Sequence, residues 1–396
     1  MMMEARTQRR SAGKRRHKDE DGRQAGRPDY ILMFILMALL SAGLIMVFSA
    51  SPTLGMQLGD SLYYLKRHVI NLIIGAVALF VGFRIDYHVL LKWAPFGLCA
   101  AVLLLLVIFI PGIGRSVGGA VRWVDLSLLS FQPSEIAKLI VVIYLASSFA
   151  SSNGENLPKL LFWALAPVLA IAYLVLKQPD LGTTLVIAAT TFVMLYLAGL
   201  QAKYLSVMIV AGVCAFAALS LTSAYRLRRM AAFLNPWKDP LNIGFHIVQS
   251  LLAIGSGGLL GLGLGASKQK FFYLPQQYTD FIFSILCEEM GFFGAAGVII
   301  LFVMFIIRGM RIARLARDEF GRLLAGGIVS WIAVQALLNL FVVTGMFPVT
   351  GIPLPFISFG GTALVVTLYA VGVLLNISTT LLPAGGSFAA IERSTQ

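Results

Sequence analysis

An acidic residue, Asp280, follows closely on two lysines, Lys268 and Lys270, in the stretch KQKFFYLPQQYTDFIFSILCEE, residues 268–289. A carboxylate can deprotonate a sugar hydroxyl as a general base, while neighbouring cations stabilise a departing diphosphate. The pattern therefore predicts a group-transfer site for an anionic substrate. On spacing alone an alternative stays open, in which Asp280 only stabilises a helix start through the helix dipole.

Other cations that could bind a diphosphate lie in separate polar loops. The motif YYLKRH contributes two of them, for which snorkelling to the membrane interface is the alternative explanation. We rank Lys66, Arg67, Lys268 and Lys270 first as substrate ligands, then Arg122 and Arg229, with Trp123 beside Arg122. We expect Glu135 and Lys138, three residues apart on one helix face, to form a supporting structural ion pair.

The residues after Asp280 predict a helix that positions it. Thr279 would be the N-cap and Asp280 would lie in the first turn. The same face would continue through Ser284, Cys287, Glu288 and Gly291, whereas Glu289 would point about 100° away. Since Glu288 would lie about 12 Å deeper than Asp280, the two carboxylates are too far apart for a dyad, and Glu288 is predicted to be a buried, paired structural acid.

Composition places these residues in a membrane protein. Of the 396 residues, 58% are hydrophobic and 12% charged, whereas a soluble domain carries about 25% charged residues. The net charge of +13 suits anionic lipid headgroups and does not indicate nucleic acid. The three cysteines lie far apart in apolar runs and fit no disulfide or metal spacing. No metal-ligand cluster is visible, although a substrate diphosphate could bring its own Mg²⁺.

Ten apolar segments are candidates for membrane-spanning helices. They are residues 30–50, 69–83, 93–110, 134–150, 160–176, 181–200, 204–222, 281–307, 323–345 and 359–377. The predicted fold is an all-α, ten-helix membrane domain over residues 30–378, with a disordered basic cytoplasmic tail over 1–29 and a cytoplasmic C-terminal tail over 379–396. Basic residues favour both termini inside, which leaves the large loop 223–280 outside.

The large loop contains the glycine-rich run GSGGLLGLGLG, Gly255 to Gly265. Its spacing does not match the dinucleotide-binding fingerprint and no strand precedes it, so a nucleotide site is excluded. The spacing of Gly257, Gly261 and Gly265 allows close packing of short helices. We therefore predict a re-entrant or surface-lying helical hairpin over residues 241–266.

Seven stretches of the chain, in order, resemble the SEDS family (shape, elongation, division and sporulation), which includes FtsW, RodA and SpoVE. They are YYLKRH, RWVDLSLLSFQPSEIAKL, KQPDLGTTLV, FLNPWKDP, HIVQSLLAIGSGGLLGLGLGASKQKFFYLP, TDFIFSILCEEMGFFGA and VTGMFPVTGIPLPFISFGG. The resemblance covers the chain from the first predicted span to the last. The residues within these motifs are closer to those of FtsW and SpoVE than to those of RodA.

The resemblance implies a peptidoglycan glycosyltransferase of the cytoplasmic membrane with ten transmembrane helices. It implies that lipid II is polymerised into undecaprenyl-diphosphate-linked glycan at the outer leaflet, in division or sporulation rather than elongation. A class B penicillin-binding protein would be the transpeptidase partner, alongside other division or elongation proteins. The family's essential acid, in the TDF motif, corresponds to Asp280 and would act as the base.

Two departures from the family pattern, and two other functions, bear on these expectations. Gln276 stands at the usual glutamate and Tyr278 near the usual histidine, while Phe359 and Thr362 alter the last motif. A lipid II flippase is the second hypothesis, but a transporter should hold its substrate near the membrane midplane, often on inverted repeats, and the strongest cluster here lies in one outer loop. A non-catalytic scaffold, the third hypothesis, predicts that Asp280 is dispensable.

Overall fold

A computed structural model describes residues 27–55, 59–117, 120–125, 130–151, 157–221, 224–270 and 278–381. Each of the ten predicted apolar segments forms a helix, as long apolar runs require in lipid. The helices are α2 (Tyr30–Gly55), α3 (Tyr63–Arg84), α4 (His88–Val107), α5 (Pro133–Ala150), α6 (Leu157–Lys177), α7 (Leu181–Leu197), α8 (Ala202–Leu221), α11 (Ile282–Leu315), α12 (Glu319–Val343) and α13 (Gly361–Ser378). The tails predicted over residues 1–26 and 382–396 lie outside the described residues.

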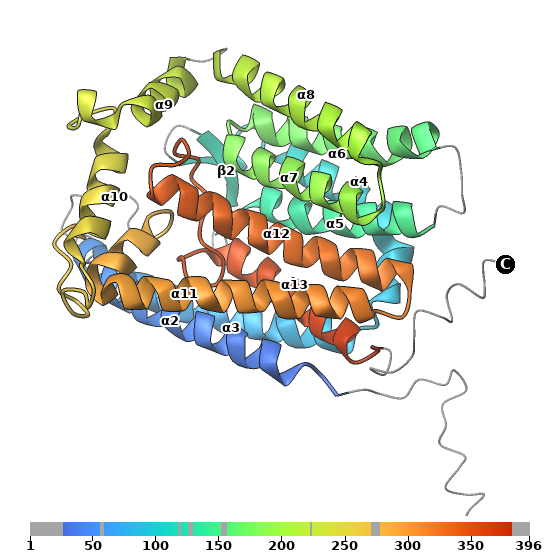
Figure 1. The fold of residues 1–396 in the computed structure, drawn as a ribbon, viewed down its shortest axis with the longest axis horizontal. Helices are drawn as coiled ribbons and strands as arrows, with labels where there is room; N and C mark the ends of the chain where they lie inside the picture. Colours follow the sequence, from blue (N-terminus) through green and yellow to red (C-terminus); the bar gives the residue numbers. More distant parts are fainter. Residues whose placement is uncertain are drawn as a thin grey trace, which may run out of the picture.

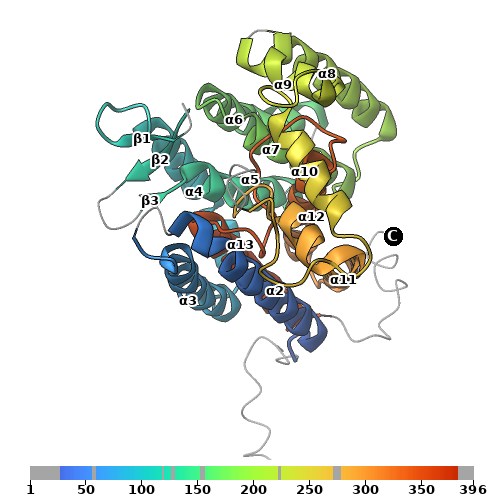
Figure 2. The ribbon, with the colours of Figure 1, turned by 90° about the vertical axis from the view of Figure 1, so that its left-hand side faces the viewer.

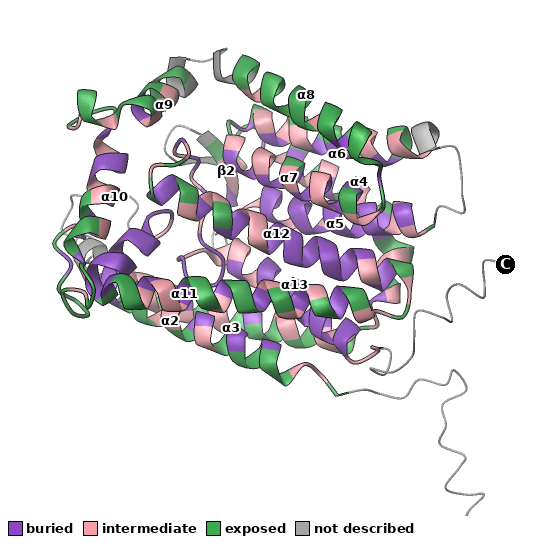
Figure 3. Cartoon of the chain, in the orientation of Figure 1, coloured by how far each residue is buried: buried purple, intermediate pink, exposed green. Residues whose placement is uncertain are grey.

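Eight of these helices are long and apolar enough to cross a membrane, by length and composition. Within the described residues, α7 and the part of α8 that runs from Ala202 to Ala218 are shorter apolar helices. The helices run side by side along one direction, and α2 begins near the end of the bundle where α13 ends (Figure 1). In α5, α12 and α13 about two thirds of the residues in the apolar stretch of the helix are buried, whereas the outer helices expose apolar side chains (Figure 3). This pattern is typical of a bundle that faces lipid.

A small sheet was not predicted from the sequence. Strands β1 (Gly114–Val117), β2 (Ala120–Asp125) and β3 (Ser130–Phe131) form an antiparallel sheet in the order β1-β2-β3. The expectation of an all-α chain is therefore wrong for this loop. Its strands are only 2–6 residues long, too short to give a clear alternating pattern in the sequence. Figure 2 shows the sheet beside α4, at the end of the bundle far from the chain termini.

The large loop holds helix α9 (Ala224–Leu234), a 3-10 turn (Pro236–Lys238) and helix α10 (Phe245–Ser256). Helix α10 packs against α11 and α12 at the same end as the sheet (Figures 1 and 2). The hairpin predicted over 241–266 is wrong in its second half, because α10 ends at Ser256 and turns and irregular backbone follow it. Repeated glycines with positive φ, at residues 258, 261, 263 and 265, take the chain out of helical geometry there.

Helix α11 is interrupted at Gly291, whose φ of 65° and ψ of −164° lie outside helical geometry. The glycine-rich segment fills the interruption with backbone hydrogen bonds in both directions. Phe292 N donates to Gly258 O at 2.9 Å, and Leu262 N donates to the carbonyl of Glu288 at 3.0 Å. Backbone groups near lipid must be paired within the protein, so the segment and the broken helix satisfy each other.

Two polar contacts between α2 and α11 are spaced by about one membrane thickness. At one end Arg308 Nη2 lies 2.8 Å from Asp29 Oδ2, and at the other Ser49 Oγ donates to Glu289 at 2.6–2.7 Å. On α2, residues 30–49 rise about 28 Å, close to the thickness of a bilayer's hydrocarbon core; on α11 the matching interval 289–308 contains the break at Gly291. The two contacts therefore mark the ends of an apolar stretch of α2 that is long enough to cross a membrane.

Candidate functional site

Asp280 lies in a turn that precedes α11, and the backbone of this turn is clamped. The consecutive carbonyls of residues 278–280 each accept one hydrogen bond from a different donor. The donors are, in order, the backbone N of Phe359 (2.9 Å), the hydroxyl of Ser358 and Nδ2 of Asn339 (2.7 Å). Since the donors belong to α12 and to the connection before α13, the clamp ties the turn to the centre of the bundle.

This clamp corrects the predicted helix start. Helix α11 begins at Ile282, its N-cap position is Phe281, and no side chain caps it. Thr279 is therefore not the N-cap and Asp280 is not in the first turn. The carbonyls at 278–280 bond to other segments and not to their own helix, so helical geometry starts two residues after Asp280. The prediction that one helical face runs from Asp280 to Gly291 is wrong for the same reason and because of the break at Gly291.

The carboxyl group of Asp280 is buried next to the backbone of Gly351. A Cβ atom at Gly351 would lie 3.5 Å from Asp280 Oδ2, and Gly351 itself has a φ of 77°. Burial raises the pKa of Asp280 to about 6, while the charges of Arg229 and Arg122 lower it and that of Asp180 raises it. A carboxyl group with this pKa is mostly ionised at neutral pH and still basic enough to accept a proton.

Arg229 reaches this site from α9. Its Nη1 donates to the backbone carbonyl of Val349 at 2.7 Å, two residues before Gly351. The guanidinium group thereby joins the large loop to the connection between α12 and α13, and its charge acts on Asp280. From the sequence we ranked Arg229 among the weaker candidates for a substrate ligand, whereas the structure brings its charge close to Asp280.

Arg122 reaches the same site from strand β2. Its Nε donates to the carbonyl of Gln178 at 3.3 Å, and its Nη1 lies 3.9 Å from Asp180 Oδ1. Arginine presents several donors in a planar fork that suits phosphate oxygens. The neighbouring Trp123 is half-buried on the same strand, paired across the sheet with Arg115.

Asp180 was not singled out from the sequence. It is buried, it caps α7 by accepting a bond from Thr183 N at 3.1 Å, and Gln132 Nε2 donates to its other oxygen at 3.2 Å. The signal was present in the motif KQPDLGT, where an aspartate stands three residues before a threonine at a helix start. This motif predicts that Asp180 caps the helix. It does not predict the contact between Asp180 and Arg122, which depends on the unpredicted sheet.

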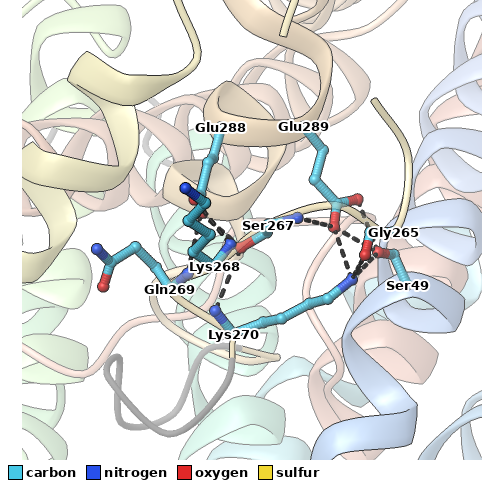
Figure 4. A network of polar contacts seen from close by, with 8 residues as sticks. All are labelled: Ser49, Gly265, Ser267, Lys268, Gln269, Lys270, Glu288 and Glu289. Carbon is cyan, nitrogen blue, oxygen red and sulfur yellow. Dashed lines mark hydrogen bonds and ion pairs between the residues drawn. The ribbon is translucent and has the colours of Figure 1, made fainter. Parts of the chain in front are cut away.

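The two lysines that precede Asp280 differ in their surroundings. Lys268 is exposed, and its backbone N donates to Glu288 Oε1 at 2.9 Å. Lys270 is 4% exposed and its Nζ lies 3.1 Å from Glu289 Oε1, in a network that includes Ser49 (Figure 4). Lys270 was predicted to bind the diphosphate, and the structure corrects this: the side chain points into the protein because a buried carboxylate requires a cation there.

Glu288 and Glu289 both lie at the break in α11. Glu288 is buried, as predicted, and it accepts bonds from the loop, including those from Ser267 Oγ and Gln269 N. The ammonium group of Lys270 pairs with the adjacent Glu289, on the side where Ser49 of α2 lies.

Lys66 and Arg67 lie on the exposed first turn of α3. Lys66 Nζ pairs with Asp60 Oδ2 at 2.7 Å, and the Arg67 guanidinium lies 4.9 Å from the ring centre of Tyr63. Tyr64 joins this turn to the site, since its ring centre is 4.5 Å from that of Tyr278. The two cations thus lie on the same side as Asp280, but no described contact links them to it.

The predicted ion pair between Glu135 and Lys138 is present and buried. Lys138 Nζ lies 2.9 Å from Glu135 Oε2 and donates to Gln335 Oε1 at 2.7 Å. Gln335 in turn donates to the carbonyl of Pro353 at 3.0 Å. The pair therefore braces α5 and α12 against the connection that borders Asp280. Among the described residues, no group of three His, Cys, Asp or Glu side chains is arranged to hold a metal ion.

Comparisons with known proteins place this arrangement among cell-wall proteins. Residues 30–381 match the model of the FtsW/RodA/SpoVE cell cycle protein family. The chain is 42% identical to a probable peptidoglycan glycosyltransferase FtsW of Geobacter metallireducens, over 90% of this chain and 96% of that one. It is 43% identical to the stage V sporulation protein E of Bacillus subtilis, over 89% and 97%.

Two solved structures resemble this one. A chain of a peptidoglycan synthase complex that coordinates polymerization and crosslinking is 30% identical, with a TM-score of 0.75, and the match covers 89% of this chain and 97% of that one. The rod shape determining protein RodA of Thermus thermophilus is 28% identical, with a TM-score of 0.67 and coverage of 90% and 98%.

Proposed function

Because the chain belongs to the FtsW/RodA/SpoVE family of cell cycle proteins, we infer that it is a peptidoglycan glycosyltransferase. It polymerises lipid II into glycan strands at the surface of the membrane in which its apolar helices lie. Relatives that carry the division and sporulation names, FtsW and stage V sporulation protein E, match it at similar identity. We therefore propose septal or spore-wall synthesis as its cellular role, with elongation as the alternative.

The observation that carries the mechanism is the buried carboxyl group of Asp280, on a turn whose backbone is clamped and under the influence of the charges of Arg229 and Arg122. We propose that Asp280 accepts the proton of the acceptor's sugar 4-hydroxyl. The oxygen then forms a bond to the anomeric carbon of the donor, whose bond to the diphosphate breaks. Two arginines from different elements, α9 and β2, would stabilise the negative charge of the leaving undecaprenyl diphosphate.

We assign supporting roles in substrate binding to most of the remaining residues that were predicted as substrate ligands. Lys66, Arg67 and Lys268 are exposed at the same end of the bundle and would attract the anionic headgroup before it reaches the arginines. Trp123 would contact the sugar or lipid beside Arg122. Lys270 is omitted from this set because it is buried against Glu289.

We propose that Asp280 lies on the outer side of the cytoplasmic membrane, with ten spans and both termini inside. Arg308, Arg311, Arg314 and Arg317 follow the apolar part of α11 at the end of the bundle where the chain termini lie, as the positive-inside rule requires. The helical part of α11 from Ile282 to Glu289 rises about 10 Å, which would put Asp280, just before it, at headgroup level, where the diphosphate of a lipid-linked substrate lies.

The broken helix α11 is the observation that favours transport as a second function, because transporters often bind substrate at such breaks. The break at Gly291, however, lies two residues from Glu289, near one membrane boundary and not at the midplane. The glycine-rich segment also satisfies its backbone groups. Both points support the transferase over the flippase.

The test is polymerisation of purified lipid II by the purified protein, with and without a class B penicillin-binding protein, beside Asp280→Asn. The peptidoglycan synthase complex among the similar structures supports including this partner. Glycan from the wild type and none from a folded Asp280→Asn protein is expected. Glycan from both proteins would remove Asp280 from the mechanism, and no glycan from either, with the partner present, would favour transport or scaffolding.

A further inference from the structure

We infer that Ser49, Lys270 and Glu289 form a latch that positions Asp280, an inference that rests on the function proposed above. None of the three lies at the reacting groups. They are positioning residues that act through the helical segment 282–290, which carries Asp280 just before one end and Glu289 near the other.

The latch joins three separate parts of the chain in a buried site. Both carboxylate oxygens of Glu289 accept from Ser49 Oγ, at 2.7 and 2.6 Å, and Oε1 lies 3.1 Å from Lys270 Nζ. The ammonium group also donates to the carbonyl of Gly265 and lies 3.4 Å from Ser49 Oγ. Figure 4 shows these contacts converging from α2, from the loop after α10 and from α11.

The adjacent carboxylate holds the same loop from another side. Glu288 accepts from the backbone N of Lys268 at 2.9 Å and of Gln269 at 3.4 Å, and from the hydroxyl of Ser267. Two consecutive glutamates, each 1% exposed, therefore fix the loop to the end of segment 282–290. A loop held at this many points has little freedom to shift against the helix.

The break at Gly291 explains why such fixation matters. In an unbroken helix, residues 282–290 would be held in line by the helix that follows. Here the carbonyls of Glu288 and Glu289 accept instead from Leu262 N and Gly263 N, both at 3.0 Å. The loop therefore holds the break end of segment 282–290, while the clamp on residues 278–280 holds the other end, and the latch anchors that loop to α2.

The geometry makes Asp280 sensitive to this orientation. Segment 282–290 is about 12 Å long by helical rise, so a tilt of about 5° at the break would move its far end, next to Asp280, by about 1 Å. A misplacement of that size can lower a catalysed rate about 100-fold. A buried ion pair contributes little net stability compared with an apolar contact, but it fixes one geometry, which is the property that a positioning element needs.

The experiment compares Lys270→Met and Glu289→Gln with Lys270→Arg and with the exchanged pair Lys270→Glu/Glu289→Lys. Steady-state polymerisation gives kcat and KM for lipid II, and hydrogen exchange reports on the backbone amides of Phe292 and Phe293. Both amides donate to the loop, to Gly258 O and Leu259 O, so their protection measures whether the loop is in place. Glu319→Gln, in the exposed pair with Arg322 on α12, is the matched control.

We expect kcat to fall about 10- to 100-fold in the two neutralised variants, with KM within about threefold, as for a change in position without a lost substrate contact. Exchange at 292 and 293 should become faster. Lys270→Arg should keep most of the wild-type kcat, and Glu319→Gln should match the wild type. Wild-type kcat in a folded Lys270→Met protein, or unchanged exchange at both amides, would overturn the latch.

Two further outcomes remain decisive. Should the neutralised variants fail to fold, Ser49→Ala removes one partner of Glu289 and keeps the charges, and the same split between kcat and KM is required of it. Should the wild type make no glycan even with its partner present, the proposed function fails. Exchange then decides on the latch alone: faster exchange in Lys270→Met supports it, and unchanged exchange refutes it.

Discussion

Asn339 on α12 donates one hydrogen bond to the carbonyl of Asp280 at 2.7 Å, and its Nδ2 also lies 2.8 Å from the carbonyl of Ile352. One buried amide group thus joins the candidate base to the connection that contains Gly351. The side chain belongs to the last turns of the largely buried helix α12, and the backbone atom belongs to the turn before α11. The contact shows that the position of the acid depends on α12 as much as on α11.

Replacing Asn339 with Ala should therefore impair both stability and catalysis. Two buried carbonyls would lose a partner, at a cost of about 1–3 kcal/mol for each unsatisfied group. We expect a lower melting temperature in detergent and a kcat at least about tenfold below wild type. Asn242→Ala, which removes an exposed bond to Asp239, is the control and should leave both unchanged. A wild-type kcat in Asn339→Ala would show that the clamp does not position Asp280.

The raised pKa of Asp280 predicts the pH dependence of the reaction. A base must be deprotonated to act, so kcat/KM should rise with pH through about 6 and then level off. A pH–rate profile on purified lipid II checks this. An acidic limb near the ordinary value of 3.8 would contradict the burial argument.

The same pKa predicts that Asp280→Asn is inactive yet more stable at neutral pH. The folded-state pKa of about 6 exceeds the ordinary value of 3.8, so folding favours the protonated acid. Above pH 6 the charged form costs up to about 3 kcal/mol, which the amide avoids. We expect a higher melting temperature for Asp280→Asn at pH 7.5, and the gap should close as the pH falls from 6 towards 4. A lower melting temperature of Asp280→Asn at pH 7.5 would contradict the argument that the buried, charged carboxylate destabilises the folded protein.

Arg229 and its neighbour Arg228 offer a matched pair of substitutions on one helix. Arg229→Met removes a charge that lowers the pKa of Asp280, so the acidic limb should move to higher pH. If the guanidinium also binds diphosphate, KM should rise about tenfold or more. Arg228 is exposed, and Arg228→Met should change neither quantity. Equal effects of the two substitutions would indicate a general loss of positive charge and no specific contact.

The buried pair Glu135–Lys138 should be costly to break singly. Lys138→Met leaves a buried carboxylate without its cation, which typically costs about 3–5 kcal/mol. The exposed pair Glu319–Arg322 provides the comparison, since Glu319→Gln should cost less than about 1 kcal/mol. Thermal unfolding in detergent measures both. Similar small losses in the two variants would mean that water reaches Lys138.

Gly291 should tolerate no side chain. Its φ is 65°, and a Cβ atom would lie 2.3 Å from Gly261 N, a distance that real contacts do not reach. Gly291→Ala should therefore displace the glycine-rich segment and lower both stability and activity. Gly297, six residues further along the same helix, has open space at its Cβ position, so Gly297→Ala should be neutral or slightly stabilising. A neutral Gly291→Ala would show that the break is not needed.

Helix positions followed from the sequence because long apolar runs have few alternatives in lipid. Each predicted span became a helix, with ends shifted by a few residues. Local spacing also predicted the pair Glu135–Lys138, since partners three residues apart on a helix must meet. These are contacts within one element, which need no knowledge of how elements pack.

The contacts that failed or were missed all join distant segments. Lys270 meets Glu289 and Ser49 only because the loop folds back into a broken helix, and nothing local indicates where a helix will break. Asp180 comes near Arg122 only through a sheet with very short strands. The role of Asn339 likewise depends on α12 lying under the turn that carries Asp280.

The two polar levels that join α2 to α11 give the protein a fixed hydrophobic length. The contacts Asp29–Arg308 and Ser49–Glu289 are separated by about 28 Å of helix on α2. Together they prevent α2 from sliding along α11. A bilayer thinner or thicker than this span must deform around the protein, at a fraction of a kcal/mol per Å. Since one of the two levels is the latch, lipid chain length acts directly on the element that orients the acid, and the enzyme is in effect matched to the thickness of its own membrane.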